Sequence, residues 1–255
     1  MVEIRNLTAG YGGKPVLQNL NLSFRPGELT VIIGPNGCGK STLLRSVIGM
    51  TPKVEGSLTL EGKDLCSLSP AQLAQSIAYL PQNKQAPDMT VSQLVLHGRF
   101  PYLQYPRRYR ETDRQIARTV MERMGIAHLA DTPLPRLSGG TAQKCYIAMA
   151  LCQGSPVILM DEPLSFLDIS HQLDLMALTK DLARQGKTMV LVLHDLALAL
   201  QWADRLILME QGAIRQTGTP EELVSKPHLE AVFGVEIHRW DSPRGIQYTF
   251  TRKEG

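Results

Sequence analysis

The chain has 255 residues and a net charge of +3, with 43% hydrophobic and 20% charged residues, a composition typical of a globular protein with a sizeable core. Aromatic residues make up only 5%, so stacking platforms for single-stranded nucleic acid are not expected, and the small charge argues against general nucleic-acid binding. The four cysteines lack zinc-ligand spacing and no stretch resembles a signal peptide or membrane span, so we expect a reduced cytoplasmic protein.

The first thirty residues or so alternate between apolar and polar positions around Gly and Pro turns, which predicts short strands, and the stretch 57–62 adds another strand and turn. These strands are expected at 2–11, 15–24, 28–34 and 57–62. Helical spacing then predicts helices at 69–80, 91–100, 111–126 and 140–153. Near-continuous apolar runs predict buried strands at 156–161 and 187–195, separated by a helix at 169–186. A hairpin with Gly212 in its turn is expected at 204–220. The pattern indicates an α/β core with a helical insertion.

The stretch GPNGCGKS at 34–41 fits the phosphate-loop pattern G-x-x-x-x-G-K-[ST] between a predicted strand and a predicted helix. Glycines let backbone N–H groups turn inward, and the helix start adds partial positive charge. Lys40 would reach the β- and γ-phosphates, and the Ser41 hydroxyl would ligate Mg²⁺. The alternative is an ordinary glycine turn that caps a helix. The predicted ATP-binding residues of this loop are Gly34, Pro35, Asn36, Gly37, Cys38, Gly39, Lys40, Ser41 and Thr42.

Two adjacent carboxylates, Asp161 and Glu162, end the apolar strand predicted at 156–161. One carboxylate at this place suits an outer contact to Mg²⁺, and the next can accept a proton from a water aimed at the γ-phosphate. Acidic pairs are also common at solvated strand ends. The pair therefore indicates a metal and water site only because it follows a phosphate loop in the same chain. We therefore predict Asp161 as a metal contact and Glu162 as the catalytic base.

Five further motifs follow in a fixed order, and with the phosphate loop they resemble the ATP-binding cassette (ABC) family over residues 2 to about 235. They are LTAGYGG with Tyr11, YLPQN with Gln82, LSGG with Ser138, Gly139 and Gly140, SFLD with Asp168, and LVLHD with His194. Taken singly, Tyr11 is better explained as a strand aromatic and His194 as a core histidine. Gln82 alone could cap a turn, and Ser138 alone could cap a helix. The ordered set favours the family.

The resemblance implies a role for each of these residues. Tyr11 would stack on adenine, Gln82 and Ser41 would join Asp161 around Mg²⁺, and Gln82, Glu162 and His194 would be the catalytic residues. Ser138, Gly139, Gly140 and Asp168 would act in trans, on the ATP held by a second copy of the chain. ATP would then join two facing copies, and hydrolysis would separate them.

The implied fold is an α/β P-loop NTPase (ABC ATPase) core with a mixed sheet, an N-terminal antiparallel β subdomain and an inserted helical subdomain. The ATPase domain would span 1–236, with its core at 1–81 and 154–236 and the helical subdomain at about 82–153. A small appendage at 237–255 has no predicted role.

Two departures from the family pattern stand out. Thr141 occupies the position after LSGG where the family usually has Gln, so a contact from there to the opposing nucleotide is expected to be lost or moved. Leu164 replaces a hydroxyl residue in the segment DEPLS. Ser138, Asp161 and Glu162 are retained, so we expect a competent ATPase with altered turnover.

Three stretches, GPNGCGKSTLLR at 34–45, VSQLVLHGRFPYL at 91–103 and LDISHQLDLM at 167–176, narrow the resemblance within the family. Together they resemble ATPases of bacterial importers for iron–siderophores, haem and cobalamin. The implied partners are a second copy, transmembrane permease subunits and, indirectly, an extracytoplasmic substrate-binding protein, with no nucleic acid, at the cytoplasmic face of the membrane. Phe100, Tyr102 and Leu103 would provide an apolar dock for the permease, or pack within the helical subdomain. The alternatives are a soluble ABC-type switch protein in repair or translation, and a P-loop small-molecule kinase.

Overall fold

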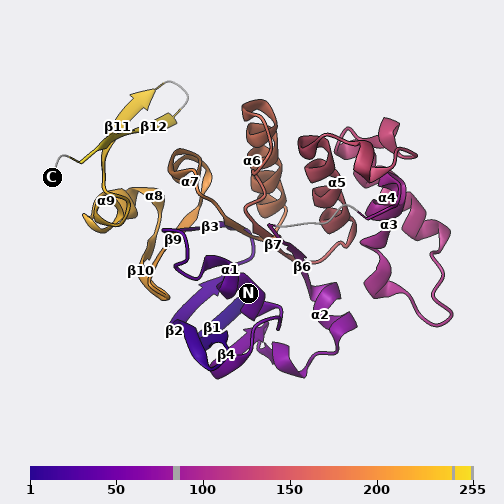
Figure 1. The fold of residues 1–255 in the computed structure, drawn as a ribbon, viewed down its shortest axis with the longest axis horizontal. Helices are drawn as coiled ribbons and strands as arrows, with labels where there is room; N and C mark the ends of the chain where they lie inside the picture. Colours follow the sequence, from indigo (N-terminus) through magenta and orange to yellow (C-terminus); the bar gives the residue numbers. More distant parts are fainter. Residues whose placement is uncertain (83–86, 243–244, 254–255) are drawn as a thin grey trace. The chain divides into compact units, whose positions relative to one another are not determined.

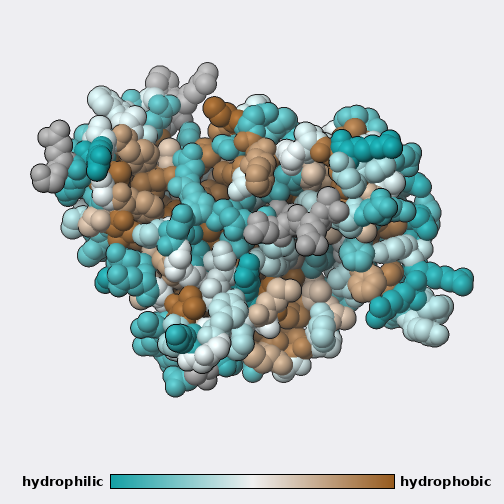
Figure 2. All heavy atoms as spheres, in the orientation of Figure 1, coloured by the Kyte–Doolittle hydropathy of each residue, from teal (hydrophilic) through white to brown (hydrophobic). Residues whose placement is uncertain are grey.

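The computed structural model describes residues 1–82, 87–242 and 245–253 and divides into two compact units. Unit 1 combines residues 1–67 with residues 178–255, and unit 2 contains residues 68–177. Figure 1 shows the course of the chain by colour, and Figure 2 shows that hydrophobic residues reach one face in separate patches among hydrophilic ones. Among the described residues, no helix is long and apolar enough to cross a membrane.

The N-terminal part of unit 1 is an antiparallel sheet with the strand order β2-β1-β4-β5. Its strands are β1 (Val2–Tyr11), β2 (Lys14–Phe24), β4 (Lys53–Leu60) and β5 (Lys63–Asp64). Ile4 of β1 lies opposite Leu22 on one side and Leu58 on the other, so apolar residues of three strands meet across the sheet. The predicted N-terminal strands are confirmed.

The second sheet of unit 1 contains both parallel and antiparallel pairs. Strand β3 pairs in parallel with β8 and β9, and β9 pairs antiparallel with β10. Every residue of β3 and β8 is buried, as expected for apolar strands covered on both faces. The elements are β3 (Leu29–Ile33), α1 (Lys40–Val47), β8 (Thr188–Val192), α7 (Leu196–Trp202), β9 (Arg205–Glu210) and β10 (Ala213–Gly218).

The C-terminal part of unit 1 follows this sheet. The predicted hairpin at 204–220 is confirmed as β9 and β10, with Gly212 at a φ of 78° in the turn. Two short helices come next, and the chain then forms a two-stranded antiparallel hairpin that contacts α7. These elements are α8 (Pro220–Val224), α9 (His228–Phe233), β11 (Val235–Ser242) and β12 (Gly245–Arg252).

Unit 2 consists mainly of helices. Helices α3, α4 and α5 contact one another, and β6 pairs in parallel with β7. The named elements are α2 (Pro70–Ser76), β6 (Ile77–Leu80), α3 (Val91–His97), α4 (Glu111–Arg123), α5 (Gly139–Cys152) and β7 (Val157–Asp161). Helix α6 (Ile169–Arg184) begins in unit 2 and ends in unit 1. Short 3₁₀ turns are Leu65–Ser67, Phe100–Tyr102, Ala127–Leu129 and Leu134–Arg136.

One predicted helix is wrong over part of its length. Residues 69–80 were expected to be helical throughout, but α2 ends at Ser76 and residues 77–80 form strand β6. The helical spacing of apolar residues continues through this segment, whereas its conformation is decided by pairing with β7, in which Ile77 lies opposite Val157. Tertiary pairing therefore overrides the local periodicity here.

A buried ion pair joins the segment after α3 to the start of α4. Arg99 Nε donates to Asp113 Oδ1 at 3.1 Å, and the backbone N–H of Arg110 donates to Asp113 Oδ2 at 3.0 Å. Only 13% of the Arg99 side chain and 9% of the Asp113 side chain are exposed. Burial raises the pKa of Asp113, but the Arg110 N–H and the Arg99 guanidinium together lower it by more, so the net pKa lies below the usual value.

We expect Asp113→Asn to destabilise the protein by about 3 kcal/mol at neutral pH, because it leaves the buried Arg99 charge without its anion. A lowered pKa contributes stability above the unfolded-state pKa of about 4, and that contribution is lost as pH falls through the folded pKa. The variant should therefore lose less stability than the parent on acidification below about pH 4.

Urea titrations at several pH values, followed by circular dichroism, would measure this difference. Asp181→Asn is the matched control, since the pair between Asp181 and Arg184 is largely exposed and should contribute less than about 1 kcal/mol. Equal effects of the two substitutions would contradict the assignment.

Candidate active site

The phosphate loop predicted at 34–41 connects β3 to α1 in unit 1. Lys40 is buried, with 5% of its surface exposed, and its Nζ atom donates to the carbonyl oxygens of Gly34 at 2.7 Å and Pro35 at 2.9 Å. The loop backbone therefore closes around its own ammonium group. Because α1 begins at Lys40, the backbone N–H groups of a helix start, which favour an anion, lie at the same loop.

Two glycines of the loop have physical reasons to be glycine. Gly34 has a φ of 150°, and a Cβ atom there would lie 2.2 Å from the carbonyl oxygen of Met209. Gly39 has a φ of 104°, and a Cβ atom would lie 2.8 Å from Leu17 Cδ2. Cys38, between them in sequence, is buried, and this burial raises the pKa of its thiol. Cys38 is therefore a packing residue of the loop rather than a nucleophile.

In each unit, site residues follow the ends of parallel strands. In unit 1, β3 and β8 are parallel neighbours, the phosphate loop follows β3, and His194 follows β8. The carboxyl ends of parallel strands lie at one edge of a sheet, where ligands bind in open α/β folds. His194 is exposed, which removes the alternative of a core histidine, and the next residue, Asp195, caps α7 by accepting from the Leu198 N–H at 2.9 Å.

In unit 2, the parallel strands β6 and β7 bring three predicted site residues together. Gln82 follows β6, and its Nε2 atom donates to Glu162 Oε2 at 2.6 Å. Asp161, the last residue of β7, is fully buried, and the Tyr79 hydroxyl donates to its Oδ2 atom at 3.4 Å. Glu162 has a left-handed φ of 50°, a strained conformation for a non-glycine residue that often marks a functional site.

Tyr11 ends β1 and is 44% exposed. Its hydroxyl forms a hydrogen bond with Thr51 Oγ1 at 3.1 Å, and this bond is the main cause of the lowered pKa of Tyr11. The bond anchors one end of the side chain while much of the side chain remains at the surface. Such an anchored, exposed aromatic can stack on a planar base.

The LSGG residues open helix α5 in unit 2. Ser138 is the N-cap, and its Oγ atom accepts from the Thr141 N–H at 3.3 Å. Gly139 and Gly140 line a hollow of about 570 Å³ together with Ser138 and Asp168, so the structure brings the four residues predicted to act in trans to one place. The other lining residues are Gly125, Ile126, His128, Leu129, Thr141, Lys144, Phe166 and His171.

The two departures have local partners. The Thr141 hydroxyl forms a hydrogen bond with Ser138 Oγ at 2.9 Å, so this residue contributes to the helix cap. Leu164 is buried, with 8% of its surface exposed, and packs into the loop that leads from Glu162 to α6.

Three residues that the sequence did not single out also belong to this region. Gln143 of α5 is buried, and its Nε2 atom donates to the carbonyl oxygen of Pro163 at 2.6 Å, directly after Glu162. His171 and Gln172 contact the loop before α6. A polar Gln143 amid the apolar residues of its helix is a signal that could have been noticed, whereas the partners of His171 and Gln172 depend on folding.

The aromatic residues proposed as a permease dock are partly exposed. Phe100 is 39% and Tyr102 37% exposed. The guanidinium carbon of Arg99 lies 3.9 Å from the Tyr102 ring centre, and that of Arg107 lies 4.9 Å from the Phe100 ring centre. Each ring therefore makes a cation–π contact with an arginine, while part of each ring remains exposed at the surface.

Residues 17–165 match the ABC transporter family, a segment of more than half of the chain. The chain belongs to the ABC transporter family. It is therefore an ABC ATPase, and the predicted fold class, an α/β core with an antiparallel β subdomain, a mixed sheet and helices, is confirmed. Its phosphate loop and LSGG residues lie within the matched segment.

Known ABC proteins match nearly the whole chain. It is 41% identical over 239 residues to the ferric enterobactin transport ATP-binding protein FepC of Escherichia coli (strain K12), covering 93% of this chain and 88% of that protein. It is 38% identical over 240 residues to the iron(3+)-hydroxamate import ATP-binding protein FhuC of Bacillus subtilis (strain 168), covering 93% and 89%. The dimeric structure of the bacterial ABC transporter cassette MJ0796 has a TM-score of 0.75 and 27% identity, covering 86% of this chain and 99% of that one.

We expect Gly34→Ala to lower the affinity for ATP by roughly tenfold or more, because the added Cβ atom collides with a strand carbonyl and the loop must shift to relieve it. Gly62→Ala, in the turn between β4 and β5, is the matched control: it also has a positive φ, of 79°, but a Cβ atom there meets nothing within 4 Å. Titration of both variants with a fluorescent ATP analogue would measure the difference. Equal affinities would contradict this account of the loop.

Proposed function

We propose that the chain is the ATP-hydrolysing subunit that energises a separate membrane permease for the uptake of an iron–siderophore or a related metallo-cofactor such as haem or cobalamin. The observation that carries the proposal is the phosphate loop closed around Lys40 Nζ at the start of α1. The likeness to FepC and FhuC supports the importer class and the iron chelate.

In this proposal, Lys40 binds the β- and γ-phosphates of ATP, and Tyr11 stacks on adenine. Ser41, Gln82 and Asp161 would hold Mg²⁺. All three present oxygen atoms, the donor type that Mg²⁺ prefers, and a nearby cation would stabilise a carboxylate as fully buried as Asp161. The ion supplies neutralisation of the phosphate charge.

Hydrolysis depends on Glu162, Gln82 and His194. Glu162 takes the proton from the attacking water, and the Gln82 amide, 2.6 Å from its Oε2 atom, holds the carboxylate in place. His194 is the third catalytic residue, and it occupies the exposed position after β8. The strained φ of Glu162 fixes the direction in which the carboxylate leaves the strand.

Two copies form a sandwich around two ATP molecules. Ser138, Gly139, Gly140 and Asp168 contact the nucleotide held by the other copy. The gathering of these four residues around one hollow supports this role, as does the similarity to a dimeric cassette. Nucleotide binding then joins the copies, and hydrolysis releases them.

The dimer works at the cytoplasmic face of a bacterial membrane with transmembrane permease subunits, and indirectly with an extracytoplasmic substrate-binding protein. Phe100, Tyr102 and Leu103 form part of the permease dock. We further propose an ATPase domain at 1–236, with its core at 1–81 and 154–236 and the helical subdomain at about 82–153, followed by an appendage at 237–255.

A pull-down of the full chain from its native membranes, with metal and cofactor analysis of what the partner permease binds, tests the importer function. Recovery with a permease that takes up an iron chelate, haem or cobalamin would support it. Recovery only in a soluble ATP-dependent complex would favour a switch protein instead, and phosphate transfer to a metabolite would favour a kinase.

Lys40→Ala should weaken ATP binding by about 2–4 kcal/mol, or roughly a hundredfold, because it removes a cation that would make charge-assisted bonds to the phosphates. Calorimetric titration with ATP and a phosphate-release assay would measure the loss. Lys63→Ala, which removes an exposed lysine of β5, is the control and should bind normally. Undiminished hydrolysis by Lys40→Ala would refute the phosphate-loop assignment.

Glu162→Gln should leave ATP binding intact but slow hydrolysis by roughly 10²-fold or more, as expected when a positioned base is removed. The slow variant should also accumulate as an ATP-bound dimer, which sedimentation velocity would detect. Glu221→Gln, at an exposed position of α8, is the control for the charge change. A Glu162→Gln protein that remains monomeric with ATP would argue against the sandwich.

A further inference from the structure

The loop between β7 and α6 holds an aromatic residue in an unfavourable conformation. Phe166 has a φ of 68°, in the left-handed region, and is 82% exposed. A bulky residue pays a steric cost in this region, and little burial of its own side chain offsets it. A turn bond from the Leu167 N–H to the Leu164 carbonyl, at 3.2 Å, spans the residue. Contacts from outside the turn must therefore stabilise the conformation.

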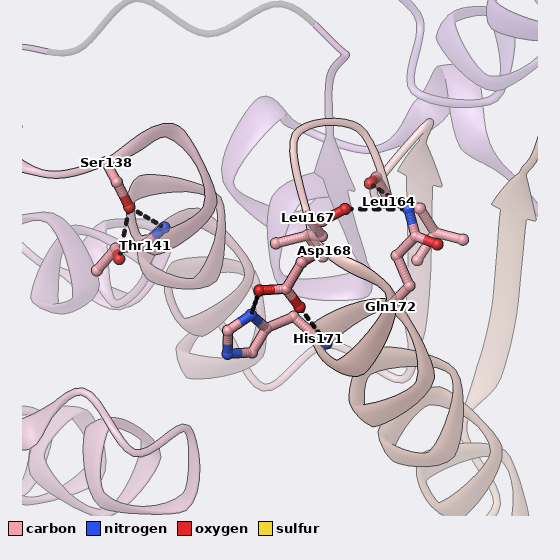
Figure 3. Close-up of polar contacts among 7 residues, drawn as sticks. All are labelled: Ser138, Thr141, Leu164, Leu167, Asp168, His171 and Gln172. Atoms are coloured by element: carbon pink, nitrogen blue, oxygen red, sulfur yellow. Dashed lines mark hydrogen bonds and ion pairs between the residues drawn. The ribbon is translucent and has the colours of Figure 1, made fainter.

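The first turn of α6 supplies these contacts (Figure 3). Gln172 Nε2 donates to the carbonyl oxygen of Leu167 at 3.1 Å and lies 3.4 Å from that of Leu164, so one amide spans both sides of Phe166. His171 reaches Asp168 twice: its backbone N–H donates to Oδ1 at 2.9 Å, and its Nδ1 atom lies 2.9 Å from Oδ2.

The bond between His171 and Asp168 fixes the imidazole as well as the carboxylate. Asp168 can only accept when ionised, so Nδ1 of His171 must carry the proton. The backbone N–H of His171 is the main cause of the lowered pKa of Asp168, and the imidazole and the Lys144 ammonium lower this pKa further. The carboxylate is therefore ionised at neutral pH and held at both oxygen atoms.

The same loop lies against the start of α5. A Cβ atom added at Gly140 would lie 3.2 Å from the carbonyl oxygen of Phe166, and one at Gly139 would lie 3.6 Å from Phe166 Cβ. Phe166, Asp168 and His171 line the hollow that Ser138 also lines. A shift of this loop would therefore change the wall of the hollow at the LSGG residues.

We propose that His171 and Gln172 are positioning residues, which hold the loop of residues 164–168 in the one conformation that lets Ser138, the two glycines and Asp168 engage the nucleotide of a second copy. The inference rests on the proposed sandwich of two copies. His171 sets the direction of the Asp168 carboxylate, and Gln172 fixes the backbone on both sides of Phe166. Neither residue needs to touch the reacting phosphate.

Hydrogen exchange of the full chain, measured on the peptide that contains residues 164–168, tests whether His171 and Gln172 hold this loop. Exchange should rise roughly fivefold or more in His171→Ala and in Gln172→Met, because each removes side-chain bonds that hold the loop. His171→Asn should stay near the parent, since its amide can donate to Asp168 from about the position of Nδ1. Unchanged exchange in both His171→Ala and Gln172→Met would overturn the inference.

Pairing of two copies tests the functional part, in the slowly hydrolysing Glu162→Gln background. With ATP and Mg²⁺, His171→Ala and Gln172→Met should raise the dimer dissociation constant roughly tenfold, with ATP affinity of the monomer unchanged and His171→Asn restoring pairing. A misfolded protein would lose nucleotide affinity too. Normal pairing by both variants, despite raised exchange, would overturn the positioning role.

His228→Ala and Gln185→Ala are the matched controls, because both residues are exposed and lie outside this loop. They should change neither exchange of residues 164–168 nor pairing. If the Glu162→Gln parent itself fails to pair with ATP, the sandwich of the proposed function is wrong, while the exchange measurement still decides whether His171 and Gln172 hold the loop.

Discussion

The active site depends on a buried cation that is held by the backbone next to it. A buried ammonium group is costly unless its N–H groups find acceptors, and at Lys40 two loop carbonyls accept from it. The loop can adopt this path only because Gly34 fits beneath a carbonyl of β9 and Gly39 fits beside Leu17 of β2. The shape of the phosphate loop is therefore set by neighbouring strands as much as by its own sequence, and mutations in those strands can act on the site.

Parallel pairing explains why, within each unit, motifs that are far apart in the sequence follow the carboxyl ends of neighbouring strands. The phosphate loop and His194 follow the parallel neighbours β3 and β8, and Gln82 and Glu162 follow the parallel neighbours β6 and β7. This part of the candidate site could be predicted from the sequence. Continuous apolar runs indicate buried parallel strands, and polar residues directly after such runs lie where ligands bind in open α/β folds. At the end of β7 the chain passes from the fully buried Asp161 to Glu162, whose positive φ turns the backbone out of the strand.

The sequence could not predict the contacts that hold these elements in register. The segment 77–80 has helical spacing, yet its pairing with β7 makes it a strand, and only the fold supplies that partner. Gln143 stands out as a polar residue in an apolar helix, but the sequence does not show that its partner is the Pro163 carbonyl. His171 and Gln172 bond to oxygens of the same loop, and these bonds leave no spacing pattern. The motifs therefore predict the candidate site from the sequence, whereas the polar contacts from α5 and α6 to this loop become visible only in the fold.

Thr141, where the family usually has Gln, has a side chain that bonds to Ser138 at the start of its own helix. A longer residue at this position would reach into the hollow, whereas the Thr141 hydroxyl forms a hydrogen bond with Ser138 Oγ. Ser138 Oγ accepts a further bond from the Thr141 N–H. Ser138 is thus held by both the backbone and the side chain of one residue, which narrows its choice of rotamers. In the proposed sandwich, a more rigid Ser138 would lose less conformational entropy on meeting a nucleotide, and this gain would offset part of the contact that a longer residue would make.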